Sequence, residues 1–373
     1  MRFLLGLVIC SFPVILFSQT SKYYLQVGTY TAGKGEGIYS YEFNAANGTA
    51  ALKNVAKTDN PSFLAISNDE HYLYAIKEDG KDSISAARAY TFNKKTGELN
   101  FINQQRSKSI GGCYIKADKK NKWLFTANYR GGTLSVFPLK SDGSIDTLAQ
   151  LIVHRGSSIH KTRQQEAHVH TVVFSPNEKY LICTDLGTDK ITLYPFTPSA
   201  AFPLDKVHSI EITSKPGNGP RHIAFSKEEK FMYVINELSG TIDVFNFNGG
   251  NTKLIQTIST DSTDNTDKGS ADIHLSRDGK FLYCTNRGKY NTISTYSVEA
   301  KTGKLNLLQV LPSGGIMPRN FTIDPSNSYL LIGHQKSDNI AVFKRNQQTG
   351  LLTNIGNDIK VGSPVCLVMG NIE

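Results

Sequence analysis

Cationic and imidazole side chains stand directly in front of several alternating apolar stretches of this sequence. The stretches GPRHIAFS and PRNFTID begin in this way, and so does HVHTVVFS. The residues concerned are Arg221, His222, Arg319, His168 and His170. A strand in which apolar and polar residues alternate does not need a cation at its first residues in order to fold. These side chains are therefore candidates for binding an anionic group.

A carboxylate and a further arginine close two other apolar stretches. Glu237 follows the pattern FMYVIN, and Arg287 follows FLYCTN. With His170, Arg221 and Arg319 they would supply three arginines, one carboxylate and one imidazole. Such a set is typical of an anion-binding catalytic site. The structural alternative is that Glu237 only pairs with an arginine to tie strands together, and that His170 only caps a strand end.

An internal repeat of about 50 residues indicates which elements position these side chains. The β-rich motifs KWLFTAN, KYLICTD, KFMYVIN, KFLYCTN and SYLLIGH recur along the chain, with YYLQVGT and HYLYAIK as looser copies. Their equivalent positions are Tyr24, Leu73, Leu124, Leu181, Met232, Leu282 and Leu330. Four short strands per period, separated by Gly and Asn turns, predict an all-β fold, the seven-bladed β-propeller.

The innermost strand of the first blade is predicted to come from the far end of the chain. Six segments of the type PSFLAIS precede the repeat motifs of the later blades, whereas the seventh, SPVCLVM, occupies 363–369. We therefore expect the C-terminus to complete the blade formed by residues 23–57, which protects both sheet edges. Residues 22–373 would then form a single domain.

The antiparallel order of a blade predicts which residues meet. The start of an innermost strand and the end of the next strand lie on the same face. The strand starts carry Ser62, Cys113, His170, Arg221, Ala271, Arg319 and Val365, and the strand ends carry Thr29, Glu78, Tyr129, Leu186, Glu237, Arg287 and Gln335. The catalytic candidates should therefore surround one end of the central channel. The polar segment 155–166 is expected to rim this funnel.

The first 18 residues differ in kind from the rest of the chain. Arg2 is followed by an apolar run of about 15 residues ending at Phe17, and Ser18 offers a small residue for cleavage. This pattern predicts a secretory signal peptide over 1–18. We therefore expect a periplasmic or secreted protein that has no membrane segment after cleavage.

Charge and cysteine spacing narrow the choice of partners. The net charge of +9 comes with lysines at turns before strands, which predicts a solvated rim and no nucleic-acid partner. Cys183 and Cys284 occupy the same strand position, so buried packing is predicted for them in place of disulfide bonds. His168 and His170 are separated by one residue and could in principle ligate a metal, but no metal site is expected.

These motifs, in this order, resemble the lactonase family of seven-bladed propellers. That family includes the propeller-type 6-phosphogluconolactonases and is related to the carboxy-cis,cis-muconate lactonizing enzymes. The resemblance runs from VGTYT at 27–31 through HVHTVVFS, GPRHIAFS, VINELSG and CTNRG to HQKSDNIAVF. It implies a lactone as substrate. On the family pattern it also implies functional roles for His170, Arg221, Glu237 and Arg287.

We predict a lactonase that hydrolyses a sugar-derived or otherwise anionic lactone without a metal or an organic cofactor. Glu237 or His170 would activate water as the base. Arg221 and Arg287 would donate to the oxyanion or to a carboxylate. The planar guanidinium of Arg319 would hold a distal anionic group.

His168 and His222 are candidate substrate-binding residues, although, like His274, they could instead cap strand ends. Two other functions remain open from the sequence. A lactonizing cycloisomerase would use the same site in the cyclising direction. A non-catalytic propeller that binds a ligand or a protein would be favoured by a flat, apolar funnel.

Overall fold

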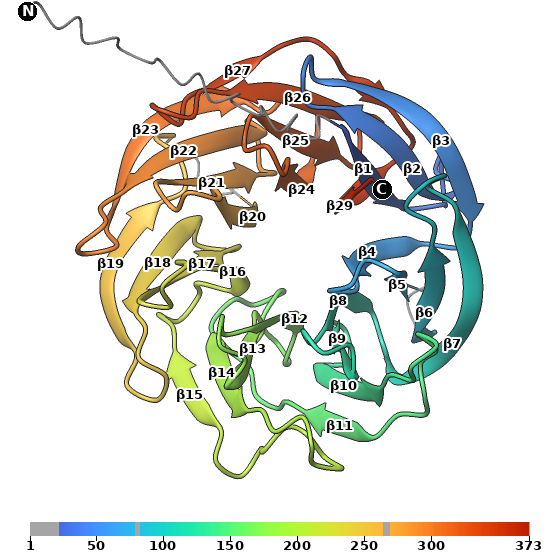
Figure 1. Ribbon diagram of the computed structural model, residues 1–373. Helices are drawn as coiled ribbons and strands as arrows, with labels where there is room; N and C mark the ends of the chain where they lie inside the picture. The colour runs from blue at the N-terminus through green and yellow to red at the C-terminus, as the bar shows by residue number, and fades with distance from the viewer. Residues whose placement is uncertain (1–21, 79–82, 264–268, 373) are drawn as a thin grey trace, which may run out of the picture.

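The computed structural model describes residues 22–78, 83–263 and 269–372. In these ranges the chain forms strands and turns and no helix. The strands make seven antiparallel sheets arranged like blades around a central axis (Figure 1), which confirms the predicted all-β seven-bladed propeller. The expected signal peptide at 1–18 lies outside the described residues. Among those residues, no helix is long and apolar enough to cross a membrane.

Each blade has four strands, counted from the axis outward. The innermost strands are β29 (Pro364–Asn371), β4 (Pro61–Ile66), β8 (Gly112–Ala117), β12 (Val169–Phe174), β16 (Pro220–Phe225), β20 (Ser270–Leu275) and β24 (Pro318–Ile323). The second strands are β1 (Lys22–Thr29), β5 (Tyr72–Lys77), β9 (Trp123–Asn128), β13 (Tyr180–Asp185), β17 (Phe231–Asn236), β21 (Phe281–Asn286) and β25 (Tyr329–His334). The third strands are β2 (Gly37–Asn44), β6 (Ile84–Phe92), β10 (Thr133–Pro138), β14 (Lys190–Pro195), β18 (Thr241–Asn246), β22 (Thr292–Val298) and β26 (Asn339–Arg345). The outermost strands are β3 (Thr49–Lys57), β7 (Leu99–Ile110), β11 (Gln150–Val153), β15 (Ile210–Thr213), β19 (Lys253–Ser259), β23 (Leu305–Pro312) and, in the last blade, β27 (Leu352–Asn354) with β28 (Ile359–Lys360).

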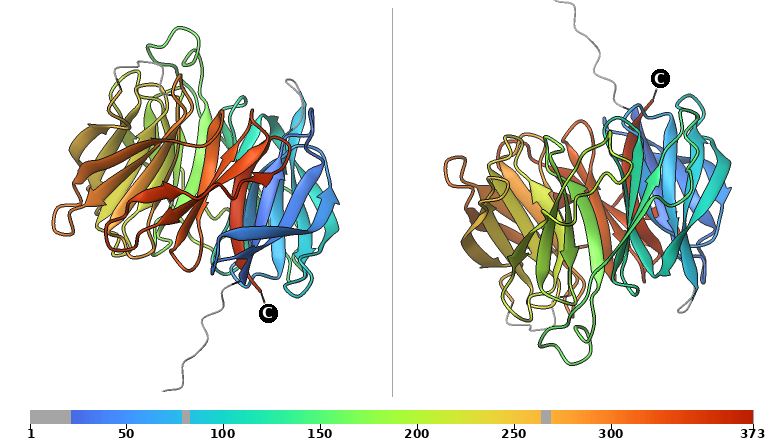
Figure 2. Two further views of the ribbon diagram at one scale, coloured as in Figure 1. Left: turned by 90° about the horizontal axis from the view of Figure 1, so that it is seen from above. Right: turned by 90° about the horizontal axis from the view of Figure 1, so that it is seen from below.

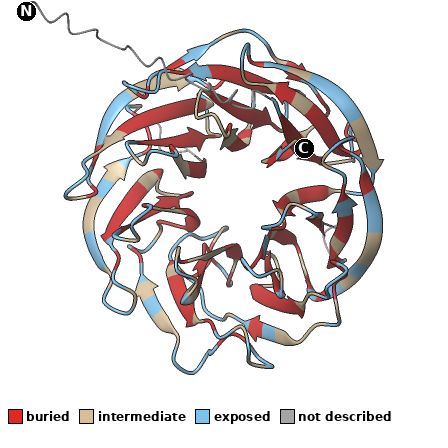
Figure 3. Cartoon of the chain, in the orientation of Figure 1, coloured by how far each residue is buried: buried red, intermediate tan, exposed pale blue. Residues whose placement is uncertain are grey.

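The inner part of each blade is buried because its neighbours cover both faces of the sheet. Every residue of β9, β17, β21 and β25 is buried, whereas β3 and β19 are mostly open to solvent (Figure 3). The hydrophobic core is therefore a ring of clusters between adjacent blades.

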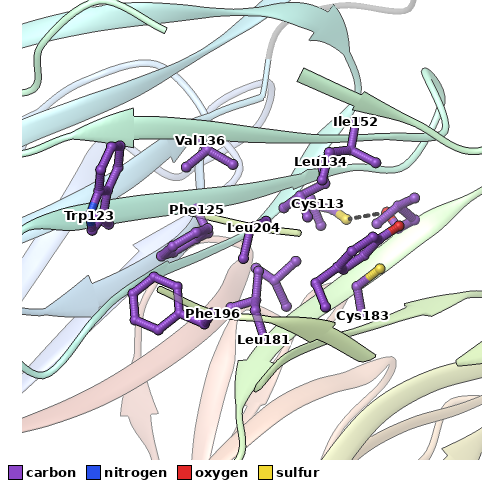
Figure 4. Close-up of a cluster of buried hydrophobic side chains, with 14 residues drawn as sticks. Cys113, Trp123, Phe125, Leu134, Val136, Ile152, Leu181, Cys183, Phe196 and Leu204 are labelled. Atoms are coloured by element: carbon purple, nitrogen blue, oxygen red, sulfur yellow. Dashed lines mark hydrogen bonds between the residues drawn. The ribbon is translucent and has the colours of Figure 1, made fainter. Parts of the chain in front are cut away.

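One such cluster joins the third and fourth blades (Figure 4). Phe125 and Leu134 of the third blade pack there with Leu181 and Cys183 of the fourth. The four cysteines in the described ranges are buried and form no disulfide bond, which confirms the packing role predicted for Cys183 and Cys284.

The two ends of the chain close the ring. Strand β29 pairs antiparallel with β1, from Tyr23 opposite Asn371 to Thr29 opposite Pro364. The sheet order β29-β1-β2-β3 confirms that the C-terminus supplies the innermost strand of the first blade. Leu367 of this strand packs in one cluster with Leu25 and Val27.

Every innermost strand starts with a β-bulge. In β12, Val169 lies opposite Asp185 and Thr171 lies opposite Thr184, so His170 is an extra residue. The extra residues of the seven strands are Ser62, Cys113, His170, Arg221, one of the pair Ala271 and Asp272, Arg319 and Val365. A bulged residue leaves the regular ladder, so the strand can aim its side chain along a new direction. The predicted strand-start positions are these bulges.

Candidate functional site

A cavity of about 280 Å³ lies at the end of the ring where the innermost strands begin. Its wall is made by Tyr30, Glu78, Gly111, Cys113, Tyr129, Arg130, Arg163, His170, Glu237, Arg287 and Arg319. Four arginines and two glutamates give this wall an excess of positive charge. Of the five residues expected to meet at the funnel, four line the cavity: His170, Glu237, Arg287 and Arg319.

A larger groove of about 630 Å³ lies at the outer edge of the ring, beside β11. Leu151, Phe202 and Val207 contribute to its mainly apolar wall. No arginine, histidine or glutamate of the described chain lines it. The smaller, charged cavity is therefore the candidate site.

The connection between β11 and β12 reaches over the cavity. Figure 2 shows this green connection projecting from one face of the ring, with the C-terminus at the opposite face. Its Arg163 lines the cavity, in agreement with the predicted rim at 155–166. The fully buried Gln164 anchors the connection by donating from Nε2 to the Leu186 carbonyl at 2.8 Å.

Glu237 is the centre of a buried ionic cluster. Its Oε1 accepts a hydrogen bond from Arg163 Nη2 at 2.6 Å. Its Oε2 accepts one from Arg221 Nε at 3.0 Å and lies 2.9 Å from Arg287 Nη2. Burial alone would raise the pKa of Glu237, but the three arginines hold it well below its usual range. Glu237 is therefore a permanent anion that fixes the arginines and has little basicity.

His170 is a neutral imidazole in the cavity wall. Its ring lies 5.6 Å from that of Tyr129 and 5.2 Å from that of His222. The Nδ1 atom is buried and has no hydrogen-bond partner among the described residues. Burial, reinforced by the charge of Arg221, holds the pKa of His170 well below its usual range. His170 is therefore uncharged at neutral pH and has a ring nitrogen without a partner among the described residues, whereas arginines occupy both oxygens of Glu237.

Arg221 lies behind the cavity wall, with its guanidinium turned toward Glu237. Only 1% of the residue is exposed. Besides Glu237, its Nη1 donates to the Ala271 carbonyl at 2.5 Å and to His222 Nε2 at 3.1 Å. Burial and Arg287 lower the pKa of Arg221 to about 9, which leaves it charged at neutral pH. Its bulged position directs it sideways into the neighbouring blade, where it holds Glu237 and adds positive charge behind His170.

The candidate substrate-binding histidines also lie outside the cavity wall. His222 donates from Nδ1 to Asp272 Oδ1 at 2.7 Å, which leaves Nε2 to accept from Arg221. Burial and Arg221 lower the pKa of His222 to about 4. His168 donates from Nδ1 to the Tyr129 carbonyl at 3.0 Å and stacks on that ring at 4.3 Å. His168 therefore supports a residue of the wall, Tyr129, and His222 supports Arg221 behind the wall.

The wall also contains residues that carry no functional signal in the sequence. Glu78 and Tyr129 occupy the same strand-end position as Glu237, so their location was expected, but their role was not. Tyr30 directly follows β1, and Arg163 enters from a loop. Within the described ranges, no three His, Cys, Asp or Glu side chains are grouped to hold a metal ion.

Comparison with known proteins gives consistent matches over the whole ring. The family model described as Lactonase, 7-bladed beta-propeller, matches residues 24–369. A 6-phosphogluconolactonase of Bacillus subtilis (strain 168) is 35% identical over 353 residues, which cover 93% of this chain and 98% of the relative. A putative 6-phosphogluconolactonase of Bacteroides fragilis NCTC 9343 has a crystal structure with 38% identity, a TM-score of 0.90, and coverage of 95% and 99%. The structure of a periplasmic gluconolactonase of Pseudomonas aeruginosa matches with 34% identity, a TM-score of 0.90, and coverage of 95% and 100%.

Proposed function

Because the chain belongs to the lactonase family of seven-bladed β-propellers, we propose that it is an enzyme that hydrolyses a sugar-derived lactone. It would thus be a carboxylic-ester hydrolase that resembles its relatives named 6-phosphogluconolactonase. The observation that carries the proposal is the pairing of a neutral, unpartnered His170 with an arginine cluster held by Glu237 at one cavity. A charged cavity of this kind is also unlike the flat, apolar funnel of a purely binding propeller.

Opening a lactone requires a base for water and donors for the developing oxyanion. His170 takes a proton from water, and the water oxygen bonds to the carbonyl carbon. Arg287 donates from Nε to the Gly269 carbonyl at 2.9 Å and contacts Glu237 through Nη2, which leaves Nη1 for the oxyanion. The ring C–O bond then breaks, and His170 returns its proton to the leaving oxygen. The product is a hydroxy acid.

The remaining arginines support this chemistry. Arg163 reaches Glu237 from the rim, with 41% of its side chain exposed, so it can contact substrate as well. Arg221 holds Glu237 from behind and thereby places Arg287. Because these groups are fixed before substrate arrives, little reorganisation is needed at the moment of reaction.

We also propose that the enzyme works outside the cytoplasm. The apolar run after Arg2 and the small Ser18 support cleavage near residue 18, and one structural relative is named a periplasmic gluconolactonase. N-terminal sequencing of protein recovered from the periplasm or medium tests this. A mature chain that still starts at Met1 in the cytoplasm would refute it.

A pH-stat assay on a panel of sugar and aliphatic lactones tests the proposed reaction, with spontaneous ring opening subtracted. We expect base uptake on sugar lactones and the hydroxy acid as the product. His170→Gln should lower kcat by about 10²- to 10⁴-fold, the usual contribution of a general base. The matched control is His208→Gln, because 77% of the His208 side chain is exposed and it lies outside the cavity. No enzymatic ring opening on any lactone would refute the proposal, and ring closure as the favoured direction would indicate a cycloisomerase.

A further inference from the structure

A second polar group faces the cavity on the side of the ring away from Glu237. It consists of Tyr30, Glu78 and Arg319, which come from the first, second and seventh blades. His170, Glu237 and Arg287 belong to the fourth, fifth and sixth blades. The two groups therefore occupy different arcs of one wall.

Tyr30 holds the other two residues in place. Its hydroxyl donates to Glu78 Oε2 at 2.9 Å. The Arg319 guanidinium lies over the Tyr30 ring, 5.6 Å from the centroid. Burial, together with the charge of Glu78, raises the pKa of Tyr30 to about 12 even though Arg319 opposes the shift, so the phenol remains a donor at neutral pH.

Glu78 and Arg319 have unused hydrogen-bonding capacity, in contrast to Glu237. Among the described residues, the Glu78 side chain makes no ion pair, and Tyr30 is its one hydrogen-bond partner. In the same part of the chain, Arg319 has neither an ion pair nor a hydrogen bond through its side chain. A free carboxylate oxygen and a free guanidinium thus both lie at the cavity, each against Tyr30.

The chemistry of this pair determines what it can bind. A carboxylate can only accept hydrogen bonds, and a guanidinium can only donate them. A sugar hydroxyl does both, so neighbouring hydroxyls on one ring can satisfy Glu78 and Arg319 together. A phosphate or carboxylate would satisfy Arg319 but would meet the negative charge of Glu78. An alkyl ring would leave both groups desolvated and unpaired.

We propose that Tyr30, Glu78 and Arg319 form a hydroxyl-recognition subsite, which makes the enzyme select an uncharged, polyhydroxylated lactone over phosphorylated and aliphatic ones. This inference rests on the proposed function, and it assigns Arg319 to hydroxyl groups in place of the distal anion expected from the sequence. A lactone whose carbonyl lies at His170 and Arg287 would project its ring substituents toward the subsite on the other arc.

The test compares kcat/KM of purified wild-type protein and Glu78→Gln on three lactones: glucono-1,5-lactone, 6-phosphoglucono-1,5-lactone and δ-valerolactone. The glutamine keeps the shape and an acceptor for Tyr30 but removes the charge. We expect a fall of about 10- to 100-fold on gluconolactone, the loss of one charged hydrogen bond. On valerolactone the change should stay within about twofold, and the ratio of phosphorylated to neutral substrate should rise by at least about tenfold.

Two further variants sharpen the result. Tyr30→Phe keeps the ring under Arg319 but frees Glu78, and it should lower kcat/KM on gluconolactone by about 3- to 10-fold. Glu98→Gln is the matched control, because Glu98 is an exposed glutamate in the turn between β6 and β7.

The outcomes separate the two proposals. A wild-type enzyme that prefers the phosphorylated lactone, or an equal fall on all three substrates, or no fall on any, overturns the subsite while leaving the lactonase function intact. Failure of the wild type to open any of the three rings overturns the proposed function itself.

Discussion

The two ends of the innermost strands differ in how closely their residues repeat from blade to blade. At the end where the first strand turns into the second, one hydrogen-bonded turn is repeated from blade to blade. Ser226 Oγ accepts from the Phe231 amide, and Ser276 Oγ accepts from the Phe281 amide. The same contact recurs at Ser67, Ser175, Asp118 and Asp324. The opposite, bulged end carries a different side chain in almost every blade.

This difference indicates where structure and function are separated in the molecule. The repeated turn has one task, which is to join two strands, and a single solution serves the six blades whose first two strands are consecutive in the chain. A bulged residue is released from the ladder, so its identity can change without disturbing the sheet. The repetition therefore marks the scaffold, and the departures from it, such as His170 and Arg319, mark the site.

Removing β29 should have the largest effect, because it takes away both ends of one innermost strand at once. A chain that ends at Gly362 loses the ladder to β1 and exposes the inner faces of two blades. We expect a loss of several kcal/mol and no cooperative melting transition at the wild-type temperature. A chain that ends at Asn371 is the control, since it keeps β29 complete. Unchanged melting of the shorter chain would show that the ring does not need this closure.

Substitution of Arg221 tests whether a bulged residue can also be structural. Arg221→Ala removes one of the three arginines around Glu237 and leaves that buried carboxylate poorly compensated. We expect a cost of about 3–5 kcal/mol in unfolding free energy, measured by urea denaturation. Arg221→Lys keeps the charge but not the fork, and should lower kcat/KM by about 10- to 1000-fold with a smaller loss of stability. Full stability of both variants would place Arg221 outside the supporting cluster.

As the pH falls, the protein should first lose stability through histidines at the bulged end of the innermost strands, and only at lower pH through carboxylates at the turn end. The pKa of His222 is about 4 in the folded protein and that of His170 is well below 6.5, whereas in the unfolded chain both take up a proton below about 6.5. Stability is therefore lost as the pH falls from about 6.5 toward 4, by up to about 1.4 kcal/mol per pH unit for each histidine. At the turn end, burial alone would raise the pKa of Asp69 and of Asp278, but hydrogen bonds from Ser67 and Ser276 keep both below 3.8. Protonation of these two carboxylates therefore destabilises the protein only at lower pH.

Urea denaturation between pH 7 and 5 measures this slope. His222→Gln should reduce it by the share of one histidine, while the exposed-site variant His208→Gln should not. A slope that is the same in wild type and His222→Gln would show that His222 does not titrate in this way.

The smallest effect is expected at the repeated turn. Ser67→Ala and Ser276→Ala each remove the acceptor of one amide hydrogen bond, at 3.0 and 3.1 Å, together with the hydroxyl that donates to Asp69 or Asp278. Each should cost about 1 kcal/mol and lower the Tm by the same few degrees, with kcat/KM unchanged. Unequal costs, or a loss of activity beyond the loss of folded protein, would blur the distinction between the two ends.

The fold was accessible from the sequence because it is periodic. A repeat of about 50 residues shows the number of blades, and the displaced copy SPVCLVM shows how they close. The predicted span 363–369 differs from β29 (Pro364–Asn371) by one residue at its start and two at its end. Antiparallel pairing then brings the strand starts and strand ends to one face, which is how His170, Glu237 and Arg287 were found.

The rest of the site depends on side-chain directions and on a loop path that the repeat pattern does not encode. A bulge has no signature in these strands, so the burial of Arg221 behind Glu237 could not be foreseen. Arg163 reaches the cavity from a long connection whose path is set by tertiary contacts. Glu78 occupies an expected position, but its free carboxylate becomes evident only when its single partner, Tyr30, is seen.

The pairing of β29 with β1 also governs the order in which the molecule can fold. The residues that meet there, such as Tyr23 and Asn371, are separated by almost the whole chain, whereas each of the other six blades is built from one continuous segment. Contacts of such long sequence separation form slowly, because the loop entropy is lost before they stabilise anything. During synthesis β1 therefore carries an open edge until the last few residues emerge, and this interval is when the chain is most exposed to aggregation.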